Sequence, residues 1–385
     1  MYSLETVINE NIAVALGSSA ENYRKRGDFA MSKKLYLEAL RVRETLSCMD
    51  KGYFQPLVVE TLKRLGKLSM EENNHDEAIN YYQRAIEGLE EIYSLLPQRY
   101  GTQLIYLYTR LGNLYRKSLE YASAADAYEK SLSLYAQRTT KELQGEERRL
   151  LNLYLQLALV LDKQKDFERT KKAYMGALSI YGTLLEEGSN LYREEMASTL
   201  FDLGVLYFRN QRKNKAGEVF LLVLEMVLSL PQEGLAHYKI LGKSFHYLGQ
   251  IYTTQLEYID GMVAYREALK YVIELAEEKP LVYGRWVAKI FIDMARSYKQ
   301  QNKRDLAQHF QAKAITLYRE LNHYHQFQYD FELAQTVITM VEEYGGHTLW
   351  LYHAQGVLRR DPQNTRATTL LDRIERIREE RNLFL

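Results

Sequence analysis

The chain has 385 residues, of which 46% are hydrophobic and 26% charged, the composition of an ordinary folded protein. Its 51 Lys and Arg residues against 50 Asp and Glu residues leave a net charge of +1, which argues against a dedicated nucleic-acid binder. It has no run of about 18 apolar residues, no basic leader at its start and one cysteine, Cys48. We therefore expect a cytoplasmic protein without a membrane span or an internal disulfide.

An aromatic residue recurs at a nearly constant spacing along most of the chain. The series has six positions. The first four steps between them are 46 residues long and the last is 45. These six positions, called the ruler residues below, are Tyr36, Tyr82, Tyr128, Tyr174, Phe220 and Tyr265. A fixed period of this length indicates a repeat architecture.

Other positions keep the same register as the ruler residues. Small or short residues stand four positions before and three positions after most of them. A further small residue stands sixteen positions before, usually after a leucine: Ala20, Gly66, Gly112, Ala158, Gly204 and Gly249. Apolar residues at i, i+3, i+4 and i+7 around these positions predict two amphipathic helices in each unit. The small residues predict a close approach of the two helices beside the ruler ring.

These residues resemble the tetratricopeptide repeat family, whose pattern is W-x2-L-G-x2-Y followed by A-x3-F/Y-x2-A. RLGNLYRKSLEYASAADAYEKSL, at residues 110–132, follows that pattern closely. The common unit of the family has 34 residues and this one has 46, so the excess of 12 adds roughly three helical turns. Pro97, Pro231 and Pro280 stand at the breaks between such lengthened units. Units of this length resemble those of kinesin light chains and of bacterial tetratricopeptide signalling proteins.

The resemblance implies an all-α fold, a right-handed α-solenoid of about eight antiparallel helix pairs with a C-terminal capping helix. We predict a single solenoid domain over residues 1–385. Its units are expected at residues 9–50, 55–96, 101–142, 147–188, 193–234, 238–279, 284–322 and 327–362, with Gly345 in the last turn and the cap helix at residues 365–381.

No catalytic motif is present, neither a phosphate-binding glycine loop nor H-E-x-x-H, C-x-x-C or G-x-S-x-G. Cys48 is a lone cysteine near a helix end, which is more typical of an incidental thiol than of a nucleophile. The histidines near the C-terminus are weak evidence for metal ligands. They are His323, His325, His347 and His353. We predict no enzyme, cofactor or metal, and keep a metal-dependent enzyme and a nucleic-acid binder as less favoured alternatives.

The resemblance places a partner in a concave groove formed by the first helix of each unit. Positions facing the groove give a basic cluster in the first three units and an apolar strip in the fourth and fifth. A rotation of the longer helices would instead place the strip in the core. The predicted groove residues are Arg24, Lys25, Lys63, Lys67, Asn113, Arg116, Lys117, Leu155, Leu159, Phe201, Val205, Phe208, Arg209, His246, Gln250, Arg296 and Lys299.

We interpret the chain as a non-catalytic scaffold or adaptor that binds a peptide or helix of a partner protein, with apolar anchors and acidic flanks. The alternative is a regulatory, inhibitory or sensor subunit that controls a partner effector enzyme, a protease or an NTPase, in trans. Neither nucleic acid nor membrane is expected as a partner. The oligomeric state, monomer or dimer, stays open, as does a pairing role for the apolar tail at residues 382–385.

Overall fold

The computed structural model describes residues 2–94, 96–138, 145–186, 190–231, 234–324, 328–360 and 365–380. In this part of the chain it contains seventeen helices and no strand, so the all-α prediction is confirmed. The helices form two compact units, Met1–Gly188 and Ser189–Leu385, which are described separately. The boundary lies between the fourth and fifth predicted repeats. A single solenoid domain over the whole chain stays a prediction. The apolar tail at residues 382–385 and His325 lie outside the described residues.

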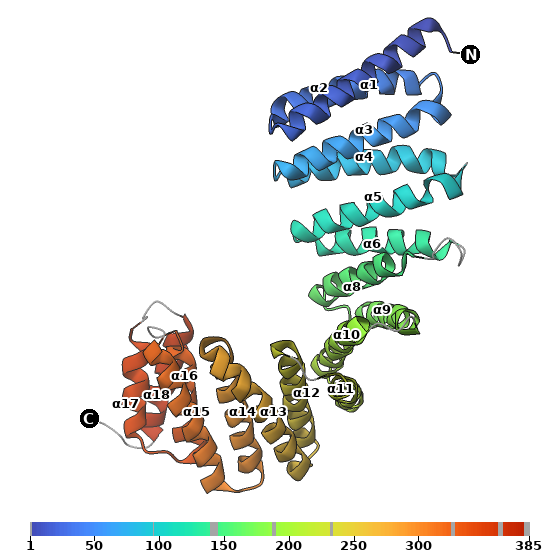
Figure 1. Cartoon of the computed structure of the whole chain (residues 1–385). Helices are drawn as coiled ribbons and strands as arrows, with labels where there is room; N and C mark the ends of the chain where they lie inside the picture. Colours follow the sequence, from blue (N-terminus) through green and yellow to red (C-terminus); the bar gives the residue numbers. More distant parts are fainter. Residues whose placement is uncertain are drawn as a thin grey trace. The chain divides into compact units, whose positions relative to one another are not determined.

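Unit 1 is a stack of helix pairs in chain order (Figure 1). Each pair joins the first and second helix of one predicted repeat. The helices are α1 (Leu4–Lys25), α2 (Phe29–Ser47), α3 (Lys51–Glu71), α4 (His75–Tyr93), α5 (Pro97–Lys117), α6 (Tyr121–Ala136), α8 (Glu147–Lys163) and α9 (Phe167–Glu186).

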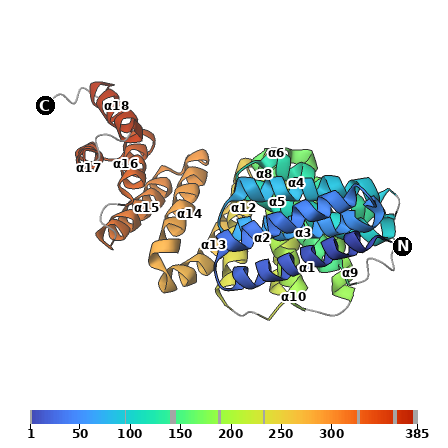
Figure 2. The same cartoon turned by 90° about the horizontal axis from the view of Figure 1, so that it is seen from above.

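Unit 2 continues the same scheme with three long pairs and a shorter final group. Its helices are α10 (Asn190–Arg209), α11 (Lys213–Leu228), α12 (Leu235–Thr254), α13 (Tyr258–Glu278), α14 (Pro280–Gln300), α15 (Arg304–Tyr324), α16 (Asp330–Tyr344), α17 (Leu349–Leu358) and α18 (Thr365–Glu380). The last helix, α18, packs on α16 and α17 through Leu370, Ile374 and Ile377 (Figure 2). It is the predicted cap helix.

The lengthened repeats appear as long helices. In the seven regular pairs each helix has 16 to 22 residues. Pro97 and Pro280 are the first residues of α5 and α14, where a missing N–H costs no hydrogen bond. Pro231 follows α11 outside any helix. Gly345 ends α16 in the left-handed conformation, at φ 74°. The predicted breaks are therefore confirmed.

The ruler residues pack against the small residue sixteen positions earlier. A Cβ atom at Gly112 would lie 2.6 Å from the ring of Tyr128, and one at Gly249 would lie 2.5 Å from the ring of Tyr265. Gly66 and Gly204 stand in the same relation to Tyr82 and Phe220. Glycine is needed there because any side chain would overlap the ring. Five of the six ruler side chains are at most 2% exposed: Tyr36, Tyr82, Tyr128, Phe220 and Tyr265.

The fourth pair departs from this rule. Tyr174 is only partly buried. Here a Cβ atom at Gly176 of α9 would lie 2.5 Å from the ring of Tyr154 of α8. In this pair the ring is therefore on the first helix and the glycine on the second, the reverse of the arrangement in the other pairs. The pair thus keeps its close contact by a different residue choice, although the partly buried Tyr174 still packs against the hydrophobic core.

The turn inside each regular pair repeats as strictly as the ruler. One residue there takes a positive φ between 58° and 81°. The N–H of the next residue donates to the carbonyl oxygen five positions earlier, at 2.8–3.1 Å, which closes the first helix with a Schellman-type bond. The residues with positive φ are Gly27, Asn73, Leu119, Lys165, Gln211, Leu256 and Asn302.

Candidate functional site

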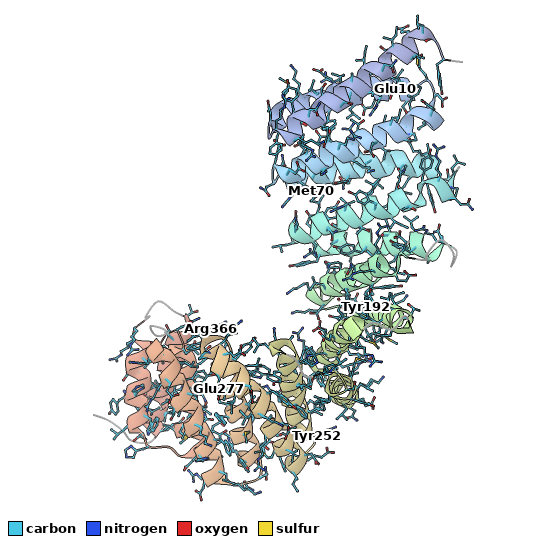
Figure 3. All side chains as sticks on the ribbon, viewed as in Figure 1. Glu10, Met70, Tyr192, Tyr252, Glu277 and Arg366 are labelled. Carbon is cyan, nitrogen blue, oxygen red and sulfur yellow. The ribbon has the colours of Figure 1, made fainter. Side chains whose placement is uncertain are left out.

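The first helices of unit 1 form two hollows, and predicted groove residues line both. The first hollow, about 450 Å³, lies between α1, α3 and α5 and includes Arg24, Lys63 and Lys67. The second, about 750 Å³ and called the α5 hollow below, lies between α3, α5, α6 and α8 and includes Asn113, Arg116 and Lys117. Met70, labelled in Figure 3, lies on the wall of the α5 hollow.

The charges of the first hollow are largely paired within the chain. Arg24 binds Glu71 at 2.8 Å and Glu21 at 2.7 Å. The hydrogen bond from Arg24, helped by one from Tyr36, lowers the pKa of Glu21 to about 2 against the effect of burial. Lys63 pairs with Glu60 at 2.8 Å. Lys25 and Lys67 are exposed. The basic cluster predicted here is therefore mostly neutralised by its own neighbours.

The α5 hollow has the opposite character, because α5 presents cations there that have no carboxylate partner among the described residues. Tyr106, Arg110, Asn113 and Lys117 follow each other at spacings of three or four residues and therefore share a face. The Arg110 guanidinium lies over the Tyr106 ring, 5.1 Å from its centre. Arg110, Arg116 and Lys117 have no ion-pair partner among the described residues, and the Arg116 Nε is buried without a hydrogen-bond partner.

A ruler residue orients Asn113. The Tyr128 hydroxyl donates to Asn113 Oδ1 at 2.8 Å. Burial raises the pKa of Tyr128, against the effect of Arg116, so the hydroxyl stays a donor at neutral pH. Because the amide oxygen is occupied, the NH2 group of Asn113 is left as a donor, and it makes no hydrogen bond among the described residues. The ruler ring therefore also positions a groove side chain.

The opposite wall of the α5 hollow comes from α8. Arg149 pairs with Glu146 at 2.6 Å, and Glu146 also accepts from the Tyr135 hydroxyl at 3.2 Å. The Gln156 Oε1 atom is buried without a partner. The hollow is lined by four cationic side chains and one carboxylate, a net charge of +3. They are Arg110, Arg116, Lys117, Arg149 and Glu146.

The predicted apolar strip is more deeply buried than expected. In unit 1, Leu159 is 43% exposed and Leu155 is partly buried. In unit 2, Phe201 and Val205 are each only 8% exposed. The expectation that no neighbouring helix buries them is wrong for these two.

Tyr247 of α12 covers this part of the apolar strip. Its ring centre lies 5.9 Å from that of Phe201 and 5.0 Å from that of Phe208. Phe220 of α11 also contacts Phe201, at 5.5 Å. The larger part of the strip in unit 2 is therefore the edge of an aromatic cluster that forms the groove floor.

Unit 2 has its own groove, made of two hollows. One, about 450 Å³, is lined by the predicted residues Phe201, Val205, Arg209, His246 and Gln250. The other, about 480 Å³, contains Gln250 and Arg296. Both are also lined by Lys289. The structure thus brings six predicted residues of unit 2 to one surface.

A buried carboxylate, which the sequence analysis missed, organises this surface. Asp293 of α14 is 5% exposed. Its Oδ2 atom lies 2.8 Å from His246 Nε2 and accepts from Gln250 Nε2 at 2.7 Å. Its Oδ1 atom accepts from Arg296 at 2.8 Å. Burial alone would raise the pKa of Asp293, but the bonds from His246 and Gln250 and the charge of Arg296 outweigh burial and lower that pKa.

Trp286 completes the network and decides the tautomer of His246. The Trp286 indole N–H donates to His246 Nδ1 at 2.9 Å. A nitrogen that accepts carries no proton, so the proton is on Nε2 and points at Asp293. Lys299 is likewise engaged, by Glu343 at 2.9 Å. Of the unit 2 groove residues, His246, Gln250, Arg296 and Lys299 are therefore bound within the chain.

Some residues of both grooves were absent from the prediction. Asp293 stands three positions before the predicted groove residue Arg296, on the same side of α14. Tyr106 and Arg110 precede the small residue Gly112 by six and two positions, whereas the predicted Asn113 directly follows it. The i, i+4 and i+7 spacing from Tyr106 to Asn113 was the available signal.

The remaining candidates lie apart from both grooves. Cys48 is exposed, and its Sγ donates to the Glu44 carbonyl oxygen. Burial lowers the pKa of His353, and Arg319 and Arg360 act in the same direction. Within the described ranges, no group of three or more His, Cys, Asp or Glu side chains is placed to hold a metal ion. No described helix is long and apolar enough to span a bilayer.

The fold and the repeated contacts define the class of protein. Consecutive helix pairs with a left-handed turn residue and a glycine under an aromatic ring form an α-solenoid of tetratricopeptide type. A family model described as "Tetratricopeptide repeat" matches residues 60–87, in α3 and α4, and residues 151–183, in α8 and α9. These two segments of the chain therefore resemble tetratricopeptide repeats. No curated protein matches the sequence.

Several solved structures are similar to this chain. The apo form of RapI is 14% identical, with 96% of this chain and 98% of that chain covered and a TM-score of 0.52. BtubC (BKLC) from P. vanneervenii is 21% identical over 64% and 92%, with a TM-score of 0.41. The STAND protein PH0952 from Pyrococcus horikoshii is 13% identical over 91% and 50%, with a TM-score of 0.49. Of these three, RapI alone exceeds 0.5, and at 14% identity it supports the fold only.

Proposed function

We propose that the chain is a protein-interaction scaffold whose α5 hollow docks an acidic, extended segment of a partner protein. The observation that carries this is a set of α5 cations without a carboxylate partner among the described residues, beside an amide that can still donate. Arg110, Arg116 and Lys117 have no ion-pair partner among the described residues, and Tyr128 leaves the Asn113 NH2 group free to donate. Cations that are already paired with carboxylates of their own chain would gain much less from an acidic ligand.

The chemistry of the segment follows from the lining. With a net charge of +3, the hollow attracts carboxylates, and each contact at about 4 Å is worth about 1 kcal/mol in water and up to about 4 kcal/mol near a protein surface. Asn113 suits a backbone carbonyl oxygen of the ligand. The buried Gln156 Oε1 suits a backbone N–H. Tyr106, 41% exposed, offers an apolar contact beside the charges.

The proposed ligand keeps the acidic flanks predicted from the sequence. Its apolar side chains are expected to contact Tyr106 and not the apolar strip of unit 2. Phe201 and Val205 lie in an aromatic cluster of unit 2, so they are less suited to hold an apolar side chain of a partner than Tyr106 is. Within the described residues, no contact favours a regulatory role over a scaffold, and one function is therefore proposed.

Selection from a random peptide library tests the proposal without knowledge of the partner. Twelve-residue peptides displayed on phage are selected on the intact chain and on a triple variant, Arg110→Ala, Arg116→Ala and Lys117→Ala. We expect Asp and Glu to be enriched on the intact chain and not on the variant. A matched variant of unit 2, Lys289→Ala with Lys299→Ala, should select the same peptides as the intact chain. Enrichment that shows no acidic bias, or that survives the triple variant, would overturn the proposal.

A further inference from the structure

The outer face of α1 has no partner helix in unit 1. Among the described helices α1 packs chiefly on α2, with its buried residues Thr6, Ala13, Gly17 and Ala20 on that side. The opposite face is exposed from one end to the other. Its large apolar residues are 46–78% exposed: Leu4, Val7, Ile8, Ile12 and Val14. A solenoid usually ends on a polar outer face, so this surface needs an explanation.

The cap helix α18, at the other end of the chain, buries its apolar face and exposes a charged one. Its apolar residues Leu370, Ile374 and Ile377 are buried against α16 and α17. Its exposed side carries charges such as Asp372 and Glu375. On α1, by contrast, Glu5 is the one charged residue among the exposed positions from Leu4 to Asn22, and the other exposed positions are uncharged. They are Leu4, Val7, Ile8, Asn11, Ile12, Val14, Ala15, Ser18, Ser19 and Asn22.

From this face we infer that α1 is a self-association surface, where the α1 helices of two copies of this chain pack antiparallel. The face is divided by size. Leu4, Ile8 and Ile12 are large and occupy its N-terminal half, while Ala15, Ser18 and Ser19 are small and occupy its C-terminal half. In an antiparallel pair the large half of each helix lies on the small half of the other. Such a contact is isologous, because each residue meets the same partner in both directions.

Charge at the two ends of α1 favours the same arrangement. The first turn contains Glu5, and the exposed Lys25 and Arg26 lie at the other end. Antiparallel packing puts the end of α1 that carries Glu5 beside the half of the other copy's α1 that ends in Lys25 and Arg26, at both ends of the contact. It also aligns the positive end of each helix dipole with the negative end of its neighbour. Parallel packing would instead place like charges together.

Cysteine cross-linking tests both the contact and its direction. In a Cys48→Ser background, a cysteine is introduced at Asn11, near the two-fold axis, or at Leu4, near one end. Antiparallel packing predicts rapid oxidation of the Asn11→Cys chain to a covalent dimer. It predicts little for Leu4→Cys, because the two Leu4 positions lie roughly 20 Å or more apart along the helices at a rise of 1.5 Å per residue. Equal cross-linking at both positions would overturn the antiparallel arrangement.

Sedimentation equilibrium measures the association itself. The chain of 45.2 kDa is expected to reach twice that mass as its concentration rises. Ile8→Asp should weaken the dimer by at least tenfold, since it places a charge in the apolar half. Val263→Asp, on an exposed site of α13 that is 54% exposed, is the matched control and should leave it unchanged. Circular dichroism confirms that both variants are folded. A monomer mass at every concentration, or equal loss in both variants, would overturn the inference.

Discussion

The α5 hollow of unit 1 and the groove around α14 in unit 2 are built in the same repeat register, but their polar groups are in opposite states. In unit 2, Asp293 engages His246, Gln250 and Arg296, and Glu343 engages Lys299. In the described part of unit 1, Arg110, Arg116 and Lys117 on α5 have no carboxylate partner, and the NH2 group of Asn113 makes no hydrogen bond. The same frame therefore supports one groove whose polar groups are paired internally and one whose cations are not, which is the surface proposed to take an anionic ligand.

The difference comes from a few residues at equivalent positions. Asn113 and Gln250 both follow the small residue of their unit, and both are held by a neighbour. The Tyr128 hydroxyl donates to the amide oxygen of Asn113, so the NH2 group of Asn113 can still donate to a ligand. In unit 2 the NH2 group of Gln250 already donates to Asp293. A single buried carboxylate thus pairs the polar groups of the unit 2 groove, because it accepts hydrogen bonds from His246, Gln250 and Arg296.

The largest expected effect comes from removing that carboxylate. Asp293→Ala should lower the free energy of unfolding of unit 2 by about 2–5 kcal/mol, since the donors of His246 and Gln250 lose their acceptor in a buried site, at about 1–3 kcal/mol each. Urea unfolding followed by tryptophan fluorescence measures it, with Trp286 in the network. Asp372→Ala, on the exposed side of α18, is the control and should change little. Equal, small effects would mean that the unit 2 network is not structural.

The contact between a ruler ring and a glycine occurs in both units, so substituting the glycine should have a similar effect on stability in each. Gly112→Ala and Gly249→Ala each place a Cβ atom 2.5–2.6 Å from a ruler ring. We expect a cost of about 1–3 kcal/mol from overpacking, which outweighs the gain of helix propensity. Gly182→Ala in α9 has no atom within 4 Å of its new Cβ and should stabilise by up to about 1 kcal/mol. Thermal melts compare the three, and a stabilising Gly112→Ala would contradict the packing role of the ruler.

Acid should act on unit 2 through Asp293. Its pKa lies below the ordinary value of 3.8 in the folded chain, so the carboxylate stabilises the fold above that value. This stability is lost as the pH falls through the folded pKa. Urea midpoints between pH 7 and pH 3 should therefore drop less steeply in Asp293→Asn than in the parent chain. An identical pH dependence in both would show that the Asp293 bonds do not stabilise unit 2.

The smallest effect concerns the turn residues, again with one example in each unit. Leu119 and Leu256 take φ values of 63° and 66° and are 69% and 68% exposed. Asparagine tolerates this conformation better, so Leu119→Asn and Leu256→Asn should each stabilise by about 0.5–1 kcal/mol. Leu222→Asn, at an exposed site inside α11, should instead destabilise by a few tenths. Loss of stability in both turn variants would contradict the strain assigned to these turns.

Much of the fold could be predicted because the ruler and the small residues report directly on helix contacts. Their spacing placed the pairs, the proline breaks and the cap helix. The exchange of roles between Tyr154 and Tyr174 could not be predicted, because both are tyrosines and only the packing of Gly176 tells them apart. The groove residues were harder. Whether Arg24 or Arg116 is paired depends on the side chains of the next repeat, and a spacing rule within one repeat does not contain that information.

The most direct test of the contrast between the grooves is the affinity of one acidic peptide for paired variants. A fluorescein-labelled peptide from the library selection is titrated by anisotropy at 50 mM and 200 mM salt. Arg116→Ala with Lys117→Ala should weaken binding roughly 10- to 100-fold, at about 1.4 kcal/mol for each factor of ten, and reduce its salt dependence. Lys289→Ala with Lys299→Ala in unit 2 should stay within about twofold of the parent chain. Loss of binding in the unit 2 variant, with the unit 1 variant unaffected, would contradict the open groove of unit 1.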